Sequence, residues 1–594
     1  MLARTSDQEF SAWLIAFDAA MTRRDIDAAA NLFLADGFWR DLVAFTWNVH
    51  TAEGQKSIRQ LLCDCVTRAM PTSWRAVGPA RLTGDTIEGM AEFETTVARC
   101  SAVIRLKDGK CWTLLTAMTE LKGCVESVGA RRPNGAPFAY RQGRKNWRRR
   151  RDDEARELGE TREPYCVIVG AGHAGLSLAA RLARLDVPTL VIERRQRNSD
   201  TWRERHESLS LHTPSWFDTM PYFPYPETWP VYPSKDQFAD WLDAYTKVMD
   251  IDVWNGAECG SAAYDDARQE WQLEITRGGR TVALHPKQLV LATGLFGRPS
   301  LPNVPGMRRF KGEQRHAFEP GSGDYAGRRC VVVGSATTAH DVCAELWEAG
   351  ADVTMIQRGP TIVMRQERLL AVLSELYGDD ARARGITTET ADLLFASVPQ
   401  RVLLDRHRQF AAWLREQDAA YYERLQAAGF LLTFGEHGGG VLPQILSSRS
   451  GYYIDAGASE LIMDGRIKLR SGVGLEALGE QSVMLSDGSE LPADVVIYAT
   501  GYEHGLPESI LPSEMARKIG RLWGFGAGIK NDPGSWEGEL RNLFKPTQQP
   551  GLWFCGHGVS GTRFYSRVLA LQIKARQLGL DTPVYKLAEA HHGG

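Results

Sequence analysis

The segment Tyr165–Gly175 constrains the fold of this chain more than any other. Its apolar residues Cys166–Val169 predict a short buried strand, which runs directly into the pattern Gly-x-Gly-x-x-Gly. Apolar residues then recur at helical spacing: Leu176, Leu178, Ala179, Leu182 and Leu185. A strand, a tight glycine turn and a helix in this order are typical of a dinucleotide-binding βαβ unit.

The three glycines of this turn have separate roles. Gly170 permits the turn, Gly172 lets a pyrophosphate approach the backbone, and Gly175 lets the helix pack closely on the strand. The next predicted strand, Thr189–Ile192, leads to Glu193, 18 residues after Gly175. An acid at this place accepts hydrogen bonds from a ribose hydroxyl. We therefore predict a dinucleotide site here, in preference to a glycine turn without a ligand.

A second unit of the same kind begins with the apolar run that ends at Gly334. Its turn has the thinned pattern Gly-x-Ala-x-x-Ala, in which Ala336 should crowd a pyrophosphate slightly. Its second strand ends at Gln357 and is followed by Arg358. A cation there fits the 2′-phosphate of NADPH, whereas Gln357 leaves NADH open as an alternative.

Composition limits the remaining possibilities. At 594 residues the chain is too long for one core, so we expect roughly two to four domains. The net charge of −3 does not indicate a nucleic-acid or anionic-membrane partner, and the ten cysteines lack the spacing of a zinc site or a disulfide framework. We find no signal-peptide pattern and no apolar run that could span a bilayer. We expect a cytoplasmic protein without metal, nucleic-acid or membrane partners.

Residues 1–125 look separate from the rest. Helical patterns come first and alternating strands follow, which indicates an α+β domain. The order resembles the cone of nuclear-transport-factor-2 (NTF2) and SnoaL-like proteins. Asp41, His50 and the tryptophans would either line a pocket or pack a core or dimer face, and we favour packing. Residues 126–163, rich in Arg, Pro and Gly, predict a linker.

Further motifs carry a family resemblance. Phe310–His316 fits the pattern Phe-x-Gly-x-x-x-His, and Ala-Thr-Gly occurs at 292–294 and again at 499–501. Together with Trp202 and the segment Leu211–Pro214, these motifs resemble class B flavoprotein monooxygenases. That superfamily comprises flavin-containing monooxygenases, YUCCA-type enzymes and Baeyer–Villiger enzymes. The aromatic residue that usually closes the pattern is Pro320 here, which weakens a Baeyer–Villiger assignment.

The resemblance implies an α/β fold with two Rossmann-like dinucleotide-binding domains, one for FAD and one for NADPH. It divides the rest of the chain into 164–305 (the first segment of the FAD domain), 306–460 (the NADPH domain with a helical insertion) and 461–594 (the second segment of the FAD domain). The residues that would hold FAD are Gly170, Gly172, Gly175, Glu193, Trp202, Thr213, Thr500 and Gly501. Those that would hold NADPH are Gly334, Ser335, Thr337, Thr338 and Arg358.

The resemblance also implies the chemistry. NADPH would reduce FAD, and O2 would then form a C4a-hydroperoxyflavin that oxygenates a small organic substrate at nitrogen or sulfur, or attacks a carbonyl side chain. Baeyer–Villiger oxidation of ketones is the alternative. His212 would donate a hydrogen bond near flavin N5 or the peroxide, or merely pack under the ring. His316, on the interdomain linker, would have a redox role or act as a structural hinge.

Two other classes are open but less favoured. A pyridine-nucleotide disulfide reductase needs a cysteine pair soon after the first turn, and the next cysteine after Gly175 is Cys259. A non-catalytic binding protein built on residues 1–125 would not need two nucleotide turns. We expect a small-molecule substrate and O2 as partners and leave a homodimer open. Residues 1–125 should be dispensable for flavin reduction, because they share no motif with the redox domains.

Overall fold

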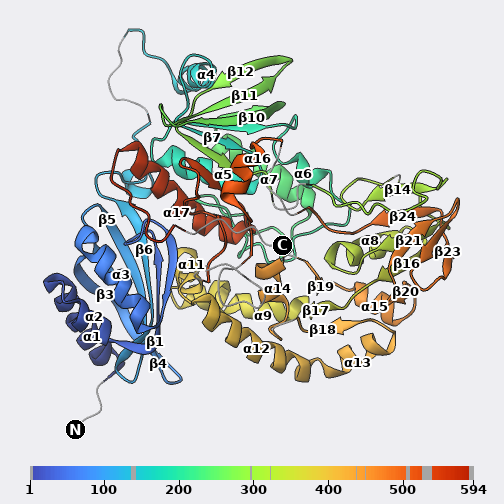
Figure 1. The fold of residues 1–594 in the computed structure, drawn as a ribbon, viewed down its shortest axis with the longest axis horizontal. Coiled ribbons are helices and arrows are strands. Elements are labelled where there is room, and N and C mark those ends of the chain that lie inside the picture. The colour runs from blue at the N-terminus through green and yellow to red at the C-terminus, as the bar shows by residue number, and fades with distance from the viewer. Residues whose placement is uncertain are drawn as a thin grey trace.

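The computed structural model describes residues 5–135, 142–294, 298–321, 323–435, 438–448, 450–503, 509–524 and 538–587. Within these ranges an N-terminal α+β domain lies against a unit built on two parallel five-stranded sheets, and a helical insertion extends from the second sheet (Figure 1). The two Rossmann-like sheets predicted from the glycine turns are confirmed. None of the described helices is both long and apolar enough to cross a bilayer.

The N-terminal domain has one six-stranded sheet in the order β2-β1-β6-β5-β4-β3. All of its strand pairs are antiparallel except β1 with β6. The strands are β1 (Phe33–Leu42), β2 (Val49–Glu53), β3 (Thr72–Thr83), β4 (Thr86–Glu94), β5 (Ala98–Lys107) and β6 (Lys110–Leu121). The helices are α1 (Ser6–Arg23), α2 (Ile26–Asn31) and α3 (Gly54–Ala69). The likeness to the NTF2/SnoaL cone stays a prediction.

Of the residues considered for a pocket in this domain, Asp41, His50 and all the tryptophans except the half-buried Trp112 are buried in its interior. Trp39 stacks on Phe33 with ring centroids 5.9 Å apart, and the Asp41 carboxylate accepts hydrogen bonds from Thr46 Oγ1 and Thr116 Oγ1, both at 2.6 Å. Burial raises the pKa of Asp41, and these hydrogen bonds only partly oppose the rise. Asp41 and Trp39 are therefore core residues, as we favoured.

The first Rossmann-like sheet has the order β25-β13-β7-β8-β9, and its described strand pairs are all parallel. Its strands are β7 (Cys166–Val169), β8 (Thr189–Glu193), β9 (Val253–Asn255), β13 (Gln288–Leu291) and β25 (Leu552–Phe554). Its helices are α5 (His173–Arg184), α6 (Asp200–Arg203), α7 (Lys235–Val248) and α17 (Val559–Gln577). A small antiparallel sheet extends from it: β10 (Ala257–Asp265), β11 (Glu270–Arg277) and β12 (Arg280–Leu284).

The second parallel sheet has the order β14-β24-β15-β16-β20. Its strands are β14 (Glu313–His316), β15 (Arg329–Val333), β16 (Asp352–Gln357), β20 (Lys468–Ser471) and β24 (Val495–Tyr498). Helices α8 (Thr337–Glu348) and α15 (Ala458–Met463) accompany it, with a small sheet of β21 (Leu475–Leu478), β22 (Ser482–Leu485) and β23 (Glu490–Pro492). Helix α16 (Ser513–Ile519) follows on the way back to the first sheet.

This topology differs from the predicted division at residue 461. Strands β20 and β24 fall within 461–594, the range expected to complete the FAD domain, yet both pair in the second sheet. Strand β24 lies between β14 and β15, and the chain returns to the first sheet only at β25. A short buried apolar strand looks the same in sequence whichever sheet it joins, because strand pairing is a long-range property.

The helical insertion lies between β16 and β20. It contains α9 (Gln366–Tyr377), α10 (Asp379–Ala383), α11 (Thr388–Ala396), α12 (Gln400–Gln417), α13 (Ala419–Ala427) and α14 (Val441–Ser448). Three short parallel strands fasten it to the second sheet's unit: β17 (Thr361–Arg365), β18 (Leu432–Thr433) and β19 (Tyr452–Asp455).

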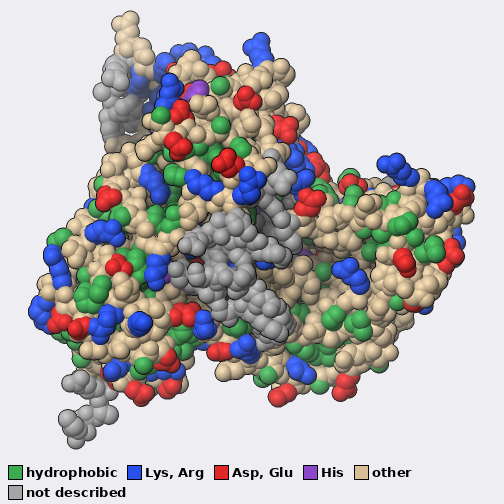
Figure 2. All heavy atoms as spheres, viewed as in Figure 1, with side chains coloured by type: hydrophobic (Ala, Val, Ile, Leu, Met, Phe, Trp, Pro, Cys, Tyr) green, Lys and Arg blue, Asp and Glu red, His purple; other side chains and the backbone are tan. Residues whose placement is uncertain are grey.

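The predicted linker 126–163 contains a helix that the sequence analysis missed, α4 (Trp147–Glu157). The Asn146 side chain caps its N-terminus by accepting from Arg149 N. The cluster of arginines is balanced by acids, as expected, and Arg151 reaches Asp252 at 2.9 Å. On the face in Figure 2, basic and acidic side chains are interspersed.

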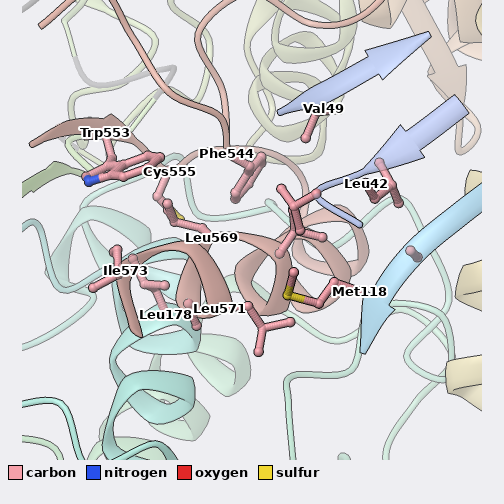
Figure 3. Packing of buried hydrophobic residues seen from close by; sticks show 14 of the residues in the cluster. Leu42, Val49, Met118, Leu178, Phe544, Trp553, Cys555, Leu569, Leu571 and Ile573 are labelled. Atoms are coloured by element: carbon pink, nitrogen blue, oxygen red, sulfur yellow. The ribbon is translucent and has the colours of Figure 1, made fainter. Parts of the chain in front are cut away.

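Helix α17 joins the N-terminal domain to the first sheet's unit. It packs against α5 on one side and against β6 on the other. Leu42 and Met118 of the N-terminal domain belong to the same buried cluster as Leu569 and Leu571 of α17 (Figure 3). The expectation that residues 1–125 are separate from the redox domains is therefore wrong at the level of packing, because the two share one continuous core.

Candidate active site

The first glycine turn connects β7 to α5. A Cβ added at Gly170, whose φ is +111°, would lie 2.4 Å from the carbonyl oxygen of Ala292, and one added at Gly175 would lie 2.0 Å from that of Gly170. The fold itself therefore requires these two glycines. A Cβ at Gly172 would meet nothing within 4 Å, and its φ of −76° suits any residue. The space in front of Gly172 is thus open at the helix N-terminus, which fits the pyrophosphate of FAD.

Glu193 ends β8 beside this turn. Its carboxylate accepts hydrogen bonds from the backbone nitrogens of Ala171 and Arg195, both at 2.9 Å. A carboxylate offers about four acceptor positions, so these two bonds fix its orientation and leave acceptors for ribose hydroxyls. Glu193 lines the same cavity as Gly172.

The second turn repeats the geometry of the first. A Cβ at Gly334, whose φ is +131°, would lie 2.4 Å from the carbonyl oxygen of Ala499. The two Ala-Thr-Gly segments therefore share one structural role, because the alanine carbonyl of each packs against the first glycine of a turn. The repeated tripeptide was a signal for this pairing, although it did not reveal that Thr500 and Gly501 follow a strand of the second sheet.

The hydroxyls predicted to hold NADPH divide into two groups. Ser335 Oγ lies 2.8 Å from Thr361 Oγ1, and Thr337 Oγ1 donates to the carbonyl oxygen of Tyr452 at 2.9 Å. Both therefore also fasten the turn to strands of the insertion. Thr338 lines the cavity together with Ser335 and Thr337.

Arg358 follows β16 and lines the cavity. It is exposed, and within the described ranges its guanidinium makes no ion pair. The neighbouring Gln357 is fully buried, with its amide donating to Leu431 O at 2.9 Å and accepting from Leu431 N at 2.8 Å. Gln357 is thus committed to the protein and unsuited to a ribose, whereas the exposed Arg358 presents its charge on the cavity wall, as the prediction of a 2′-phosphate partner requires.

Both turns open onto one cavity of about 2370 Å³. A site for one small molecule typically measures about 300–1,000 Å³, so this cavity has room for more than one ligand. Its walls include Gly172 and Glu193 from the first unit, Thr338 and Arg358 from the second, and residues of the helical insertion and the N-terminal domain.

His316 ends β14 and is 2% exposed. Its Nδ1 accepts from Phe318 N at 3.0 Å, so the proton is on Nε2, which donates to the carbonyl oxygen of Gly501 at 3.1 Å. Burial lowers the pKa of His316, which favours this neutral tautomer. With both ring nitrogens bonded to backbone, the geometry favours the hinge interpretation over a direct redox role.

His212 lines the cavity onto which both turns open, with its side chain 31% exposed. Its Nε2 lies 3.9 Å from Asp341 Oδ2, and His206 Nε2 lies 3.6 Å from the same oxygen. Burial lowers the pKa of His212, although Asp341 opposes the shift. The sequence analysis missed Asp341 and His206, because the loop and α8 are distant in the chain and nothing local signals their contact.

Trp202 and Thr213 line the same cavity as His212. Trp202 packs edge-on against Phe238 of α7, with ring centroids 4.8 Å apart. The hydroxyl of Thr213 donates to Asp218 Oδ2. Both side chains line the cavity, and both are anchored on their other side by the protein.

Comparison with known proteins identifies the family. The indole-3-pyruvate monooxygenase YUCCA1 of Oryza sativa subsp. japonica is 33% identical over 355 residues, which are 59% of this chain and 80% of that protein. The chain belongs to the YUCCA-type flavin monooxygenases. A second relative, the probable indole-3-pyruvate monooxygenase YUCCA9 of Arabidopsis thaliana, is 30% identical over 60% of this chain and 78% of its own length.

Two further comparisons concern the fold of this YUCCA-type chain. A crystal structure of cyclohexanone monooxygenase with bound ε-caprolactone has a TM-score of 0.51 at 18% identity, over 70% of this chain and 88% of that one. A family model described as pyridine nucleotide-disulphide oxidoreductase matches residues 167–393. Disulfide reductases share the paired nucleotide domains, but the first cysteine after the turn is the buried Cys259, with no second cysteine near it in the sequence.

The YUCCA-type chain is thus a flavin-dependent monooxygenase, an oxidoreductase that uses FAD and NADPH and acts on a small molecule with O2. The expectations for its class and cofactors are confirmed. The residues that hold each cofactor stay predictions, supported by the open space at Gly172 and by the exposed cation at Arg358 on the cavity wall.

His557 is a second histidine of this YUCCA-type site that the sequence analysis missed. It lies in the loop between β25 and α17, lines the cavity, and accepts a hydrogen bond from Gly558 N through Nδ1 at 2.9 Å. A Cβ at Gly561 would lie 2.1 Å from that nitrogen, so the glycine makes room for the ring. Burial, with His173 nearby, lowers the pKa of His557 to about 4.

We predict that His557 makes the folded protein sensitive to acid. Its pKa is 6.5 when unfolded and about 4 when folded, so its contribution is fully present above pH 6.5 and is lost as the pH falls from 6.5 to 4. His557→Gln should make the loss of stability over this range shallower, by up to about 1.4 kcal/mol per pH unit at the linkage limit. Melting curves at several pH values measure it, with the partly exposed His285→Gln as control. An unchanged slope contradicts the assignment.

Proposed function

We propose that this chain oxygenates a small organic substrate with an apolar or aromatic body and a carbonyl side chain. Bound FAD supplies the oxygen-activating chemistry, and NADPH supplies the hydride. In this proposal Gly172 and Glu193 hold the FAD pyrophosphate and ribose, and Arg358 holds the 2′-phosphate of NADPH.

The observation that carries the proposal is the single cavity shared by both turns and the insertion. Beyond the cofactor positions its walls are largely apolar, with these residues of the insertion: Leu369, Leu373, Leu376, Phe395, Phe410 and Leu442. Such walls exclude water, which is the main condition for productive oxygen transfer in a flavin site. They also favour a substrate with a hydrophobic body.

The names of the relatives support the choice of a carbonyl side chain, because they are indole-3-pyruvate monooxygenases. Oxygenation at nitrogen or sulfur is the second candidate. Baeyer–Villiger oxidation of ketones ranks below both, because Pro320 replaces the aromatic residue expected at the end of the Phe310–His316 motif.

The protein's contribution to the reaction is positioning. We propose that His212, whose pKa is lowered by desolvation and which lies close to Asp341, donates a hydrogen bond at the flavin edge. In this proposal His316 holds the end of β14 to the turn after β24, within the second sheet's unit, through Gly501 and Phe318. Trp202 and Thr213, anchored by Phe238 and Asp218, keep the wall beside the flavin rigid.

The test is substrate-stimulated oxidation of NADPH by the purified full-length protein, with labelled O2. A panel of aromatic 2-oxo acids, amines, sulfides and ketones is supplied, and products are identified by mass. A product that carries one labelled oxygen atom is expected from the 2-oxo acids. Labelled products only from ketones would reverse the ranking, and a protein without flavin absorption bands would refute the proposal.

The homodimer and the cytoplasmic location stay predictions. Light scattering on the purified protein tests the first, and fractionation of the source cells tests the second.

A further inference from the structure

Arg40 of the N-terminal domain makes a buried ion pair with the catalytic unit. Its Nε lies 2.6 Å from Glu539 Oε1 and its Nη2 lies 2.7 Å from Glu539 Oε2, so the pairing is bidentate. Arg40 is 2% exposed and Glu539 3% exposed. Thr51 Oγ1, on the neighbouring strand β2, donates to Glu539 Oε1 at 2.8 Å.

The remaining donors of Arg40 reach two other segments of the chain. Its Nη2 also donates to the Tyr565 hydroxyl of α17 at 2.9 Å, and its Nη1 donates to the carbonyl oxygen of Ala396, the last residue of α11. One side chain of the N-terminal domain thus holds the segment 538–545, helix α17 and the helical insertion in one arrangement.

The insertion has a second fastening at the same place. Arg563 of α17 pairs with Asp392 of α11, with Nη2 to Oδ1 at 2.6 Å and Nε to Oδ2 at 2.9 Å. Arg40 therefore holds the C-terminal end of α11, where Arg105 of the same domain also donates to the carbonyl oxygen of Ser397 at 3.3 Å. Burial alone would raise the pKa of Glu539, but Arg40 outweighs it and the pKa lies below its usual value, so both partners are charged.

These residues belong to the cavity wall. Arg40 and Val49 from the N-terminal domain line the cavity together with Ala396, Glu539 and Tyr565. Because the Arg40 charge is already matched by Glu539, it does not call for an anionic substrate. The position suits a group that keeps the wall closed.

We propose that the N-terminal domain is a fixed wall of the oxygenation cavity, and that Arg40 is the positioning residue that seals it against water. The inference rests on the proposed function, since a sealed cavity matters for oxygen transfer. It gives the domain a role in coupling, meaning the fraction of NADPH oxidation that yields oxygenated product. Without the seal, the hydride from NADPH and one solvent proton would convert O2 to hydrogen peroxide, so that both oxygen atoms leave together and none is transferred to the substrate.

The test compares Arg40→Met with Arg401→Met in the full-length flavoprotein. Arg401 pairs with Glu53 at 2.8 Å across the same interface, but it is 52% exposed and does not line the cavity. Loss of one charge-assisted hydrogen bond corresponds to about a 10- to 150-fold shift in the equilibrium between a wall that excludes water and one that admits it. We expect Arg40→Met to release mostly peroxide while anaerobic flavin reduction by NADPH keeps its rate, and Arg401→Met to behave like wild type.

Two further variants keep the test decisive if Arg40→Met folds poorly. Arg40→Met with Glu539→Gln removes the unpaired buried charge and should restore folding but not coupling. Arg40→Lys keeps a charge beside Glu539 but loses the fork that reaches Tyr565 and Ala396, so intermediate coupling is expected. Equal coupling in wild type and a flavin-loaded Arg40 variant overturns the proposal, and so does an equal loss in Arg401→Met.

Quenching of flavin fluorescence by iodide separates this inference from the proposed function, because it needs no substrate. If wild type forms no oxygenated product, the proposed function fails, while stronger quenching in the Arg40 variants than in wild type still supports the wall. Unchanged quenching overturns it.

Discussion

Gly172→Val protein should fold and purify without flavin. The side chain would enter space that no protein atom occupies within 4 Å of the Cβ position, and the backbone φ of −76° allows valine. The space is the one expected for the FAD pyrophosphate, so the valine would displace it from the amides at the start of α5. Loss of two charge-assisted hydrogen bonds lowers affinity on the order of a hundred- to ten-thousand-fold. The flavin absorption bands measure the effect.

The matched control for this variant is the neighbouring glycine. Gly170→Ala should destabilise the fold whether or not FAD is added, because its Cβ would lie 2.4 Å from the Ala292 carbonyl oxygen. The two variants thus separate a glycine needed for the ligand from one needed for the turn. Flavin retained by a folded Gly172→Val protein would show that FAD does not pass this residue.

Arg358→Ala should weaken the binding of NADPH and leave the binding of NADH nearly unchanged. Arg358 makes no ion pair with any described residue, and the adjacent Gln357 is held by both polar groups of Leu431, so Gln357 does not replace the lost cation. A guanidinium meets a phosphate with charge-assisted hydrogen bonds of about 1.5–3 kcal/mol, which correspond to roughly a 10- to 150-fold loss in affinity. The rate of anaerobic flavin reduction at limiting coenzyme reports it.

Arg358→Lys completes the comparison. A lysine keeps the positive charge but lacks the planar guanidinium that can donate two hydrogen bonds to one phosphate, so the affinity for NADPH should be intermediate. An equal loss for NADPH and NADH in Arg358→Ala, or no loss for either, would remove Arg358 from the phosphate site.

Local signals in the sequence were sufficient to predict the two nucleotide-binding units. The turns at Gly170 and Gly334 each combine an apolar run, fixed glycine spacing and a helical pattern, and all three depend on neighbours in the chain. The same holds for the charged residues Glu193 and Arg358, whose places follow from the end of a strand. The presence of two nucleotide-binding units, and the turn of each, could therefore be predicted.

Long-range pairing could not be predicted in this way. Strand β24 was assigned to the FAD domain, because the sequence of an apolar strand does not indicate which strands it pairs with. Helix α17 was recognised as a helix, but no pattern indicated that one face would pack on α5 and another on β6. The role of His316 depended on which atoms its two ring nitrogens meet, and only the folded arrangement decides that.

The ion pair between the N-terminal domain and the C-terminal part of the chain also has a consequence for folding during synthesis. Arg40 and Glu539 are separated by 499 residues. At about 5–20 residues per second, a ribosome needs roughly 25–100 s to make the second after the first. The interval between β6 and α17 is of similar length, and until α17 is made the face of β6 that it covers stays exposed. We therefore expect the nascent chain to need chaperones for longer than a protein built from self-contained domains would.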